Sequence, residues 1–160
     1  MAAQLVMYEE EFHRINAVCD RLTKDANAKV VFLVDKNGQL ISAAGQTHNI
    51  DTTSLASLTA GNVAAMGGLA KLIGENEFPN QFHEGARDSL YMTLVGGRVV
   101  LVVIFDNRTS LGLVRLRIKK ASDELEKIFA SLSARAAATP GAGSPFAEIS
   151  DADIDNLFSE

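Results

Sequence analysis

The sequence predicts an α+β sandwich, in which a five-stranded antiparallel sheet carries helices on both faces. Three observations support this fold class. Two long segments space their apolar residues alternately by three and four, as amphipathic helices do. Two pairs of β-branched runs are joined by Asn-Gly or Gly-Gly, which favour hairpins. The run at 98–105 is apolar on both faces, so it must be a central strand covered on both sides.

The first segment is an amphipathic helix. Its single cysteine, Cys19, lies on the apolar stripe, where a small buried hydrophobe is expected, and it excludes an intrachain disulfide. No signal peptide is visible, so we expect the protein in a reducing cytoplasm. The stripe consists of Leu5, Tyr8, Phe12, Ile15, Cys19, Leu22 and Ala26.

Two strands, 28–35 and 39–45, follow around Asn37-Gly38, whose residues permit the positive φ angles of a tight turn. Asp51 and Thr52 or Thr53 then offer side-chain oxygens to cap a central helix that should run to about Gly74. Residues 52–70 of this helix carry no charge. We expect its apolar stripe to pack on the core. That stripe comprises Leu55, Leu58, Met66, Leu69 and Ile73.

The opposite side of the central helix consists of small residues, where a solvated helix would carry Lys and Glu. A glycine inside a helix costs on the order of 1 kcal/mol relative to alanine, so this face calls for a compensating close contact. The contact is either tight packing within the chain or packing against a partner. A membrane span is disfavoured by the polar and glycine content. The small residues are Ser57, Ala60, Gly61, Ala64, Gly67 and Gly68.

A short strand at 81–84 is predicted after Pro79, followed by strands at 88–95 and 98–105 joined by Gly96-Gly97. The last helix starts at Thr109 or Ser110 and runs to about Ala138. The short strand should lie at a sheet edge, where a second copy of the chain could pair with it. The residues of this dimer edge are Gln81, Phe82 and His83.

The chain divides into a domain at 1–138, a flexible Pro/Gly linker at 139–147 and a short acidic amphipathic helix or tail at 148–160. The 21 residues from 140 onward hold five of the 20 acidic residues and none of the 15 basic ones, so the tail carries the whole net charge of −5. Such a peptide is too short to stay helical alone and should fold on a partner, the alternative being a disordered solubilising tail. Its partner-binding residues are Phe146, Ile149, Ile154, Leu157 and Phe158.

No catalytic or cofactor site is predicted. His13, His48 and His83 lack metal-ligand spacing, and no phosphate-binding G-x-x-x-x-G-K-[ST] is present. The charge pattern disfavours nucleic acid. Arg108, at a strand-to-helix turn, could stabilise a transferring phosphate, but we interpret it as a turn residue. The protein is therefore expected to act by binding rather than as an enzyme.

Three segments, VVFLVDKNGQLIS, SLASLTAGNVAAMGGLA and VVLVVIFDNRTSLGLVRLRIKKASDEL, together with the element order, resemble the Roadblock/LC7 family over most of the chain. The resemblance implies a cytoplasmic homodimer that binds a small Ras-like GTPase and stimulates GTP hydrolysis in bacterial cell polarity and gliding motility. A polar location in the cell is a further expectation from the resemblance. It would order the switch loops of the GTPase without an arginine finger, and its tail would modulate nucleotide exchange or affinity.

The GTPase-binding or dimer face is carried over to the small residues of the central helix, with Ala64 and Gly68 most central. The full set is Ser57, Ala60, Gly61, Ala64, Gly67, Gly68 and Lys71. The alternative function is a non-catalytic roadblock scaffold that tethers a motor or cytoskeletal protein.

Overall fold

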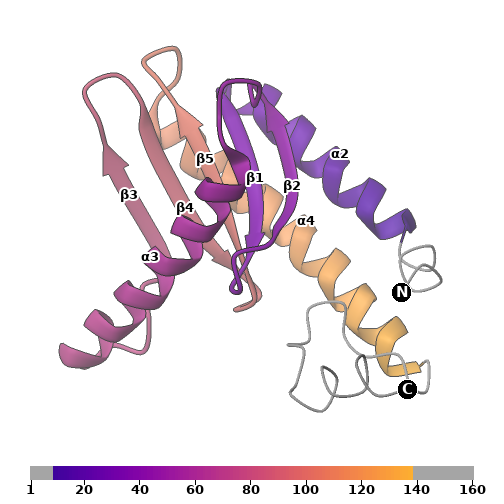
Figure 1. The fold of residues 1–160 in the computed structure, drawn as a ribbon. Coiled ribbons are helices and arrows are strands. Elements are labelled where there is room, and N and C mark those ends of the chain that lie inside the picture. Colours follow the sequence, from indigo (N-terminus) through magenta and orange to yellow (C-terminus); the bar gives the residue numbers. More distant parts are fainter. Residues whose placement is uncertain (1–8, 139–160) are drawn as a thin grey trace, which may run out of the picture.

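A computed structural model of the chain describes residues 9–138, which form one sheet between two helical layers (Figure 1). The strand order is β2-β1-β5-β4-β3, and every neighbouring pair is antiparallel. The predicted fold class and element order are therefore confirmed. The elements are α2 (Glu9–Asp25), β1 (Val30–Asp35), β2 (Leu40–Gly45), α3 (Thr52–Leu72), β3 (Asn80–Glu84), β4 (Ser89–Val95), β5 (Val99–Phe105) and α4 (Leu111–Ala138).

β5 lies in the middle of the sheet and β3 at one edge, as the apolar patterns predict. The side chains of β5 alternate between two cores. Leu101 and Val103 belong to the larger core, beneath α2 and α4, while Val100 and Val102 belong to a smaller core beneath α3. Each of these four side chains is at most 1% exposed. The two-sided burial of β5 therefore sets the three-layer architecture.

The larger core joins the apolar stripes of α2 and α4 to one face of the sheet. Ile15, Cys19 and Leu22 of α2 pack with Leu125 and Leu132 of α4 in this cluster. Burial raises the pKa of the Cys19 thiol to about 11, so the group is an unreactive hydrophobe, as its place on the stripe predicts.

The β1–β2 turn differs from the predicted one. Only Gly38 takes a positive φ, +89°, whereas Asn37 does not. The buried Asp35 carboxylate instead accepts hydrogen bonds from the backbone N–H groups of Asn37 and Gln39, both at 2.9 Å. The Asp35 side chain thus accepts hydrogen bonds from two backbone N–H groups of the turn, in place of carbonyl partners across the hairpin. In the β4–β5 turn, Gly96 and Gly97 both have positive φ, as expected.

Side-chain caps place the starts of α3 and α4. The Asp51 carboxylate accepts from the Ser54 backbone N–H at 3.1 Å, and its hydrogen bonds to Ser54 lower the pKa of Asp51. Ser110 Oγ accepts from the Leu113 backbone N–H at 3.2 Å. Both caps match the prediction, although α3 ends at Leu72, two residues before Gly74.

Gly45 at the end of β2 is a position where only glycine fits. Its φ is +90°, and a Cβ there would lie 2.3 Å from the Lys29 carbonyl oxygen.

We therefore expect Gly45→Ala to lower the free energy of unfolding by about 2 kcal/mol or more in urea denaturation. Gly112→Ala is the matched control, because a Cβ at Gly112 meets no described atom within 4 Å. Alanine there should leave stability unchanged or raise it by up to about 1 kcal/mol. Equal effects at the two positions would contradict this interpretation.

Candidate functional site

The face that α3 turns toward the sheet is not the one predicted from its large apolar residues. Leu58 is 73% exposed, Leu69 46% and Ile73 64%, and Leu72 beside them is 84% exposed. Of the predicted stripe, Leu55 and Met66 are half-buried. The prediction that this stripe packs on the chain's own core is therefore wrong for three of its five members.

α3 instead packs on the sheet through the small residue Ala56, with the half-buried Leu55 and Val63 beside it. Its buried residues are Ala56, Thr59 and Ala70, and Ala56 contacts the cluster of Val30, Phe32 and Val102. The sheet face already carries bulky valine, phenylalanine and methionine side chains, so the helix can approach closely only where its own residues are small. Helical periodicity identified an apolar stripe but could not say which stripe the sheet would accept.

The β1–β2 turn contacts the first half of α3. A Cβ at Gly38 would lie 3.3 Å from Ser57 Cα and 3.6 Å from Ala60 Cβ. A side chain at position 38 would therefore crowd the helix backbone at Ser57 and the Ala60 methyl group, which accounts for the glycine in this turn. Whether the small residues of α3 pack within the chain or against a partner stays a prediction.

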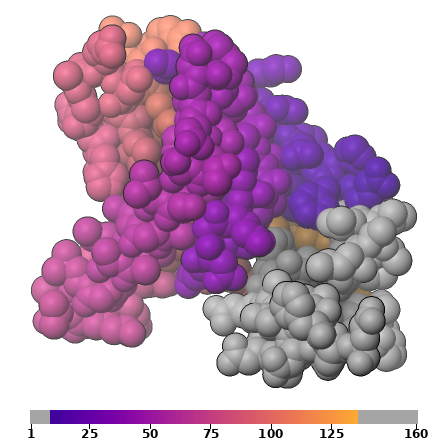
Figure 2. All heavy atoms as spheres, viewed as in Figure 1, coloured from indigo at the N-terminus to yellow at the C-terminus, as the bar shows by residue number. Residues whose placement is uncertain are grey.

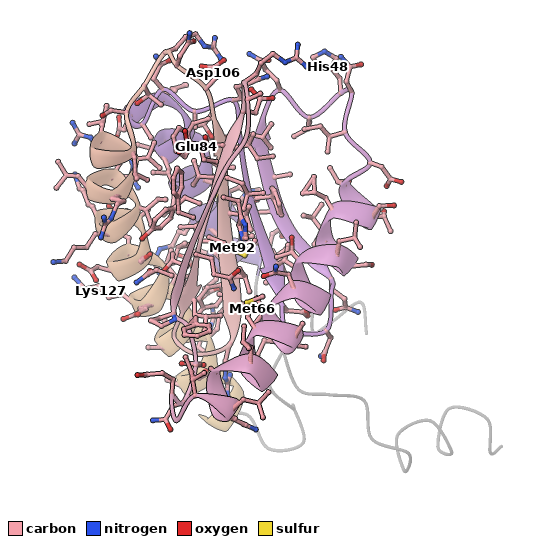
Figure 3. All side chains as sticks on the ribbon, turned by 90° about the vertical axis from the view of Figure 1, so that its left-hand side faces the viewer. His48, Met66, Glu84, Met92, Asp106 and Lys127 are labelled. Carbon is pink, nitrogen blue, oxygen red and sulfur yellow. The ribbon has the colours of Figure 1, made fainter. Side chains whose placement is uncertain are left out.

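The second half of α3 extends away from the sheet (Figures 1 and 2). A groove of about 370 Å³ lies between this half, the loop after it and β4. In Figure 3, Met66 of α3 and Met92 of β4 both lie in the layer between the helix and the sheet. Five of the seven residues predicted for the interaction face line this groove, namely Ala60, Ala64, Gly67, Gly68 and Lys71.

Three glycines of α3 have open surroundings. A Cβ built on Gly61, Gly67 or Gly68 meets no atom of the described residues within 4 Å. Packing within the described chain therefore does not compensate the helix penalty of these glycines. Tight packing within the described residues therefore does not explain these three glycines, and packing against a partner stays a prediction.

The sheet beside α3 is incompletely covered, because α3 lies over β1 and β2. Leu90, Leu94 and Ile104 on this face are only half-buried. The edge strand β3 lies beyond them, anchored from the other face by the ring of Phe82, which stacks on Phe105 with a centroid separation of 6.2 Å. Gln81 and His83 of β3 pair with each other through their side chains at 3.2 Å. The predicted edge residues thus border an uncovered apolar strip.

Arg108 lies far from the groove. Its Nε donates to Asp106 Oδ1 at 3.0 Å, and the Arg108 backbone N–H and guanidinium lower the pKa of the Asp106 carboxyl. Asp106 and Met66 lie at opposite ends of the sheet in Figure 3. Arg108 is therefore held as a turn residue, in agreement with the interpretation from sequence.

Within residues 9–138, no three His, Cys, Asp or Glu side chains gather as a metal site would require. No helix in this part of the chain has the length and apolarity to cross a bilayer. The predicted tail residues Phe146, Ile149, Ile154, Leu157 and Phe158 lie outside the described residues. The linker at 139–147 does too, so the proposed boundaries there remain predictions.

The described fold agrees with the comparisons to known proteins. The Roadblock/LC7 domain matches residues 14–105, more than half of the chain. The chain belongs to the Roadblock/LC7 family.

Three solved structures are especially similar. A Myxococcus xanthus MglB structure is 93% identical, with 74% of this chain and 97% of that chain covered and a TM-score of 0.73. A Thermus thermophilus structure described as gliding protein MglB is 33% identical, with 74% and 90% covered and a TM-score of 0.70. An MglB described as having a tetrameric arrangement is 31% identical, with 74% and 89% covered and a TM-score of 0.70.

The sequence analysis did not name six of the groove residues, which are Lys36, Val63, Asn76, Glu77, Phe78 and Leu94. Lys36 belongs to the β1–β2 turn and Phe78 to the loop after α3, so neither falls on the helical face that periodicity identifies. In the sequence, Lys36 precedes the predicted Asn37-Gly38 turn and Phe78 precedes Pro79, and neither position indicates a groove. The surroundings of these residues depend on tertiary packing.

The open surroundings of Gly61 lead to a stability prediction. Gly61→Ala should raise the free energy of unfolding by up to about 1 kcal/mol in urea denaturation, because alanine is the better helix former and its methyl group clashes with nothing in the described chain. Gly38→Ala provides the contrast and should be destabilising, since Gly38 has positive φ and lies against Ser57. A clear loss of stability in Gly61→Ala would contradict this prediction, because it would show that a methyl group at position 61 clashes with neighbouring atoms.

Proposed function

We propose that this protein is a homodimeric GTPase-activating protein for a small Ras-like GTPase of the MglA type. It would bind the GTPase over the second half of α3 and stimulate hydrolysis by ordering the switch loops, with no catalytic site of its own. Its acidic tail would modulate nucleotide exchange or affinity. The cellular setting would be bacterial cell polarity and gliding motility, in keeping with the description of the Thermus relative as a gliding protein.

The observation that carries the proposal is the uncompensated surface of α3. Within residues 9–138, no packing contact explains Gly61, Gly67 and Gly68, and Ala64 and Lys71 are exposed beside them. A surface without large side chains allows the backbone of a partner to approach closely. High identity to MglB supports a partner of the kind that the family resemblance implies.

Dimer formation is supported by apolar surface around the same helix. The exposed side chains of Leu58, Leu69 and Leu72 form an apolar patch of a kind that monomers seldom leave open to water. A second copy pairing at the edge strand β3 would bring these groups together.

Two charge observations among the described residues support stimulation without an arginine finger. Lys71 is the one charged residue in α3, and Arg108 is held by Asp106 at the far end of the sheet. Phosphoryl transfer depends on positioning and on charge stabilisation, and an ordered switch loop can supply both from the GTPase's own residues. The protein would therefore hold the switch loops of the GTPase in the conformation that favours hydrolysis.

Substitution of the open face should abolish activation. Ala64→Arg with Gly68→Arg places two long cations where the partner's backbone must approach, so GTP hydrolysis in a single-turnover assay should fall to the intrinsic rate of the GTPase. We expect a loss of at least about tenfold, ~1.4 kcal/mol in transition-state free energy. Leu116→Arg on α4, where Leu116 is 63% exposed on the other helical layer, is the matched control and should stimulate normally.

Unchanged stimulation by the folded double variant would eliminate this assignment of the GTPase surface. If the wild-type protein bound the GTPase without altering hydrolysis, the scaffold alternative would replace the proposed function. Circular dichroism of each variant establishes that the fold is retained before the rates are compared.

The apolar patch should control self-association. Leu69→Glu with Leu72→Glu puts carboxylates into a contact that would bury leucine, where each lost side chain contributes about 1.5–3 kcal/mol. We expect the dimer dissociation constant to rise by at least about 100-fold in analytical ultracentrifugation. Leu116→Glu is the control and should leave the constant unchanged. A dimer of unaltered affinity in the double variant would place the self-association surface elsewhere.

A further inference from the structure

The first half of α4 carries cations that have no acidic partner. Residues 107–122 include five basic side chains and no Asp or Glu. Arg108 is held by Asp106, but within residues 9–138 none of the other four forms an ion pair with a carboxylate. These four residues, called the basic cluster below, are Arg115, Arg117, Lys119 and Lys120.

The basic cluster repels itself along the helix. Arg115 and Lys119 are four residues apart and Arg117 and Lys120 three apart, spacings at which like charges destabilise a helix. The carboxylates that come next in α4 do not relieve this repulsion, because Glu124 already accepts a hydrogen bond from Arg21 of α2 at 2.6 Å. An anion from outside the described residues would therefore be attracted to the basic cluster.

The surface that bears the basic cluster is convex, because it is the outer side of a helix. Val114 and Ile118 are buried in the larger core. Three of the four cations, Arg115, Lys119 and Lys120, are exposed. A small ligand needs a concave site, whereas long cations on a convex surface can reach a flat anionic one.

The furrow between α2 and α4 beside the basic cluster is too small for a partner's side chain. Its volume is about 10 Å³, and both residues of the Arg21–Glu124 ion pair line it. Among the described residues of α2 and α4, the one exposed large apolar side chain is Leu116. A stable protein interface needs a packed apolar centre, which this surface lacks. Charge and shape therefore favour the headgroup layer of an acidic lipid bilayer over an acidic protein.

The basic cluster and α3 lie on opposite sides of the sheet. α4 contributes to the larger core and α3 to the smaller one, and in Figure 3 Lys127 of α4 and Met66 of α3 lie on either side of the sheet. A protein that rests on a bilayer through α4 would keep its α3 side toward solution. Two chains paired antiparallel at β3, as in the proposed dimer, would hold both α4 helices on one side of the extended sheet, so two basic clusters would face one bilayer.

We propose that the basic cluster binds the surface of an anionic lipid bilayer. Lys119 and Lys120 meet the acidic headgroups, and the exposed Leu116 one turn before them lies at the interface. The contact is peripheral, since no helix within residues 9–138 could cross a bilayer. This binding goes beyond the proposed function and needs no GTPase. It would leave the α3 side open to partners in solution.

Sedimentation of the full-length protein with lipid vesicles tests this proposal. The protein should sediment with vesicles of equal parts phosphatidylcholine and phosphatidylglycerol, and not with phosphatidylcholine alone. The bound fraction should fall as NaCl is raised, because salt screens the attraction. Sodium phosphate at the same ionic strength should weaken binding no more than NaCl does, which separates a lipid surface from a site for free phosphate.

Neutralising the two lysines provides the decisive comparison. Each cation near an anionic surface raises partitioning roughly fivefold, so Lys119→Gln with Lys120→Gln should lower the partition coefficient by at least about tenfold. Lys119→Arg with Lys120→Arg keeps the charge and should bind as the wild type does. Lys36→Gln with Lys71→Gln removes the same charge from exposed positions on the α3 side and should leave vesicle binding unchanged.

Three results would overturn the proposal: no sedimentation with anionic vesicles, equal sedimentation with neutral ones, or undiminished binding by a folded Lys119→Gln, Lys120→Gln variant. Circular dichroism establishes that each variant keeps the wild-type fold. None of these results bears on the proposed function, because the assay contains no GTPase. A protein that binds anionic vesicles through the basic cluster but stimulates no GTPase would leave this inference standing and remove the proposed function.

Discussion

Burial of β5 on both faces is the constraint on which the rest of the structure depends. Seven consecutive apolar residues, Val99–Phe105, leave no side that water could cover, so each face of the sheet must carry a helix. The α2–α4 pair has two long apolar stripes and builds the larger core. The other face is left to α3 alone, and a single helix cannot cover five strands. The incomplete cover is a direct result of the arrangement that buries β5.

The way α3 meets the sheet explains why its exposed side is unusual. Because the sheet face already holds bulky side chains, close packing places the small residue Ala56 at the contact. Leu58, Leu69 and Leu72 are turned outward, and Gly61, Gly67 and Gly68 have open surroundings. One side of a single helix thus offers both an apolar patch and a surface of small residues. A dimer contact and a partner contact can lie next to each other on such a helix.

Much of the fold could be predicted from the sequence because its signals are local. The central position of β5, the caps at Asp51 and Ser110, and the Gly96-Gly97 turn each depend on residues close together in the chain. The orientation of α3 is different. The helix has one stripe of large apolar residues and one of small residues, and either could be buried. Amphipathic periodicity favours burial of the large residues. The choice depends on the shape of the opposing sheet face, which is assembled from strands distant in sequence.

The sequence by itself determined the layers, the strand order at the centre and edge, and the presence of a helix face that avoids charge. Periodicity and turn chemistry suffice for these features, since each is encoded within a few neighbouring residues. Only the tertiary structure decided which face of α3 is buried and that Lys36, Lys71 and Phe78 line one groove. The reason is steric: packing density inside the sheet layer admits the small side of α3, and the groove exists where the helix then leaves the sheet.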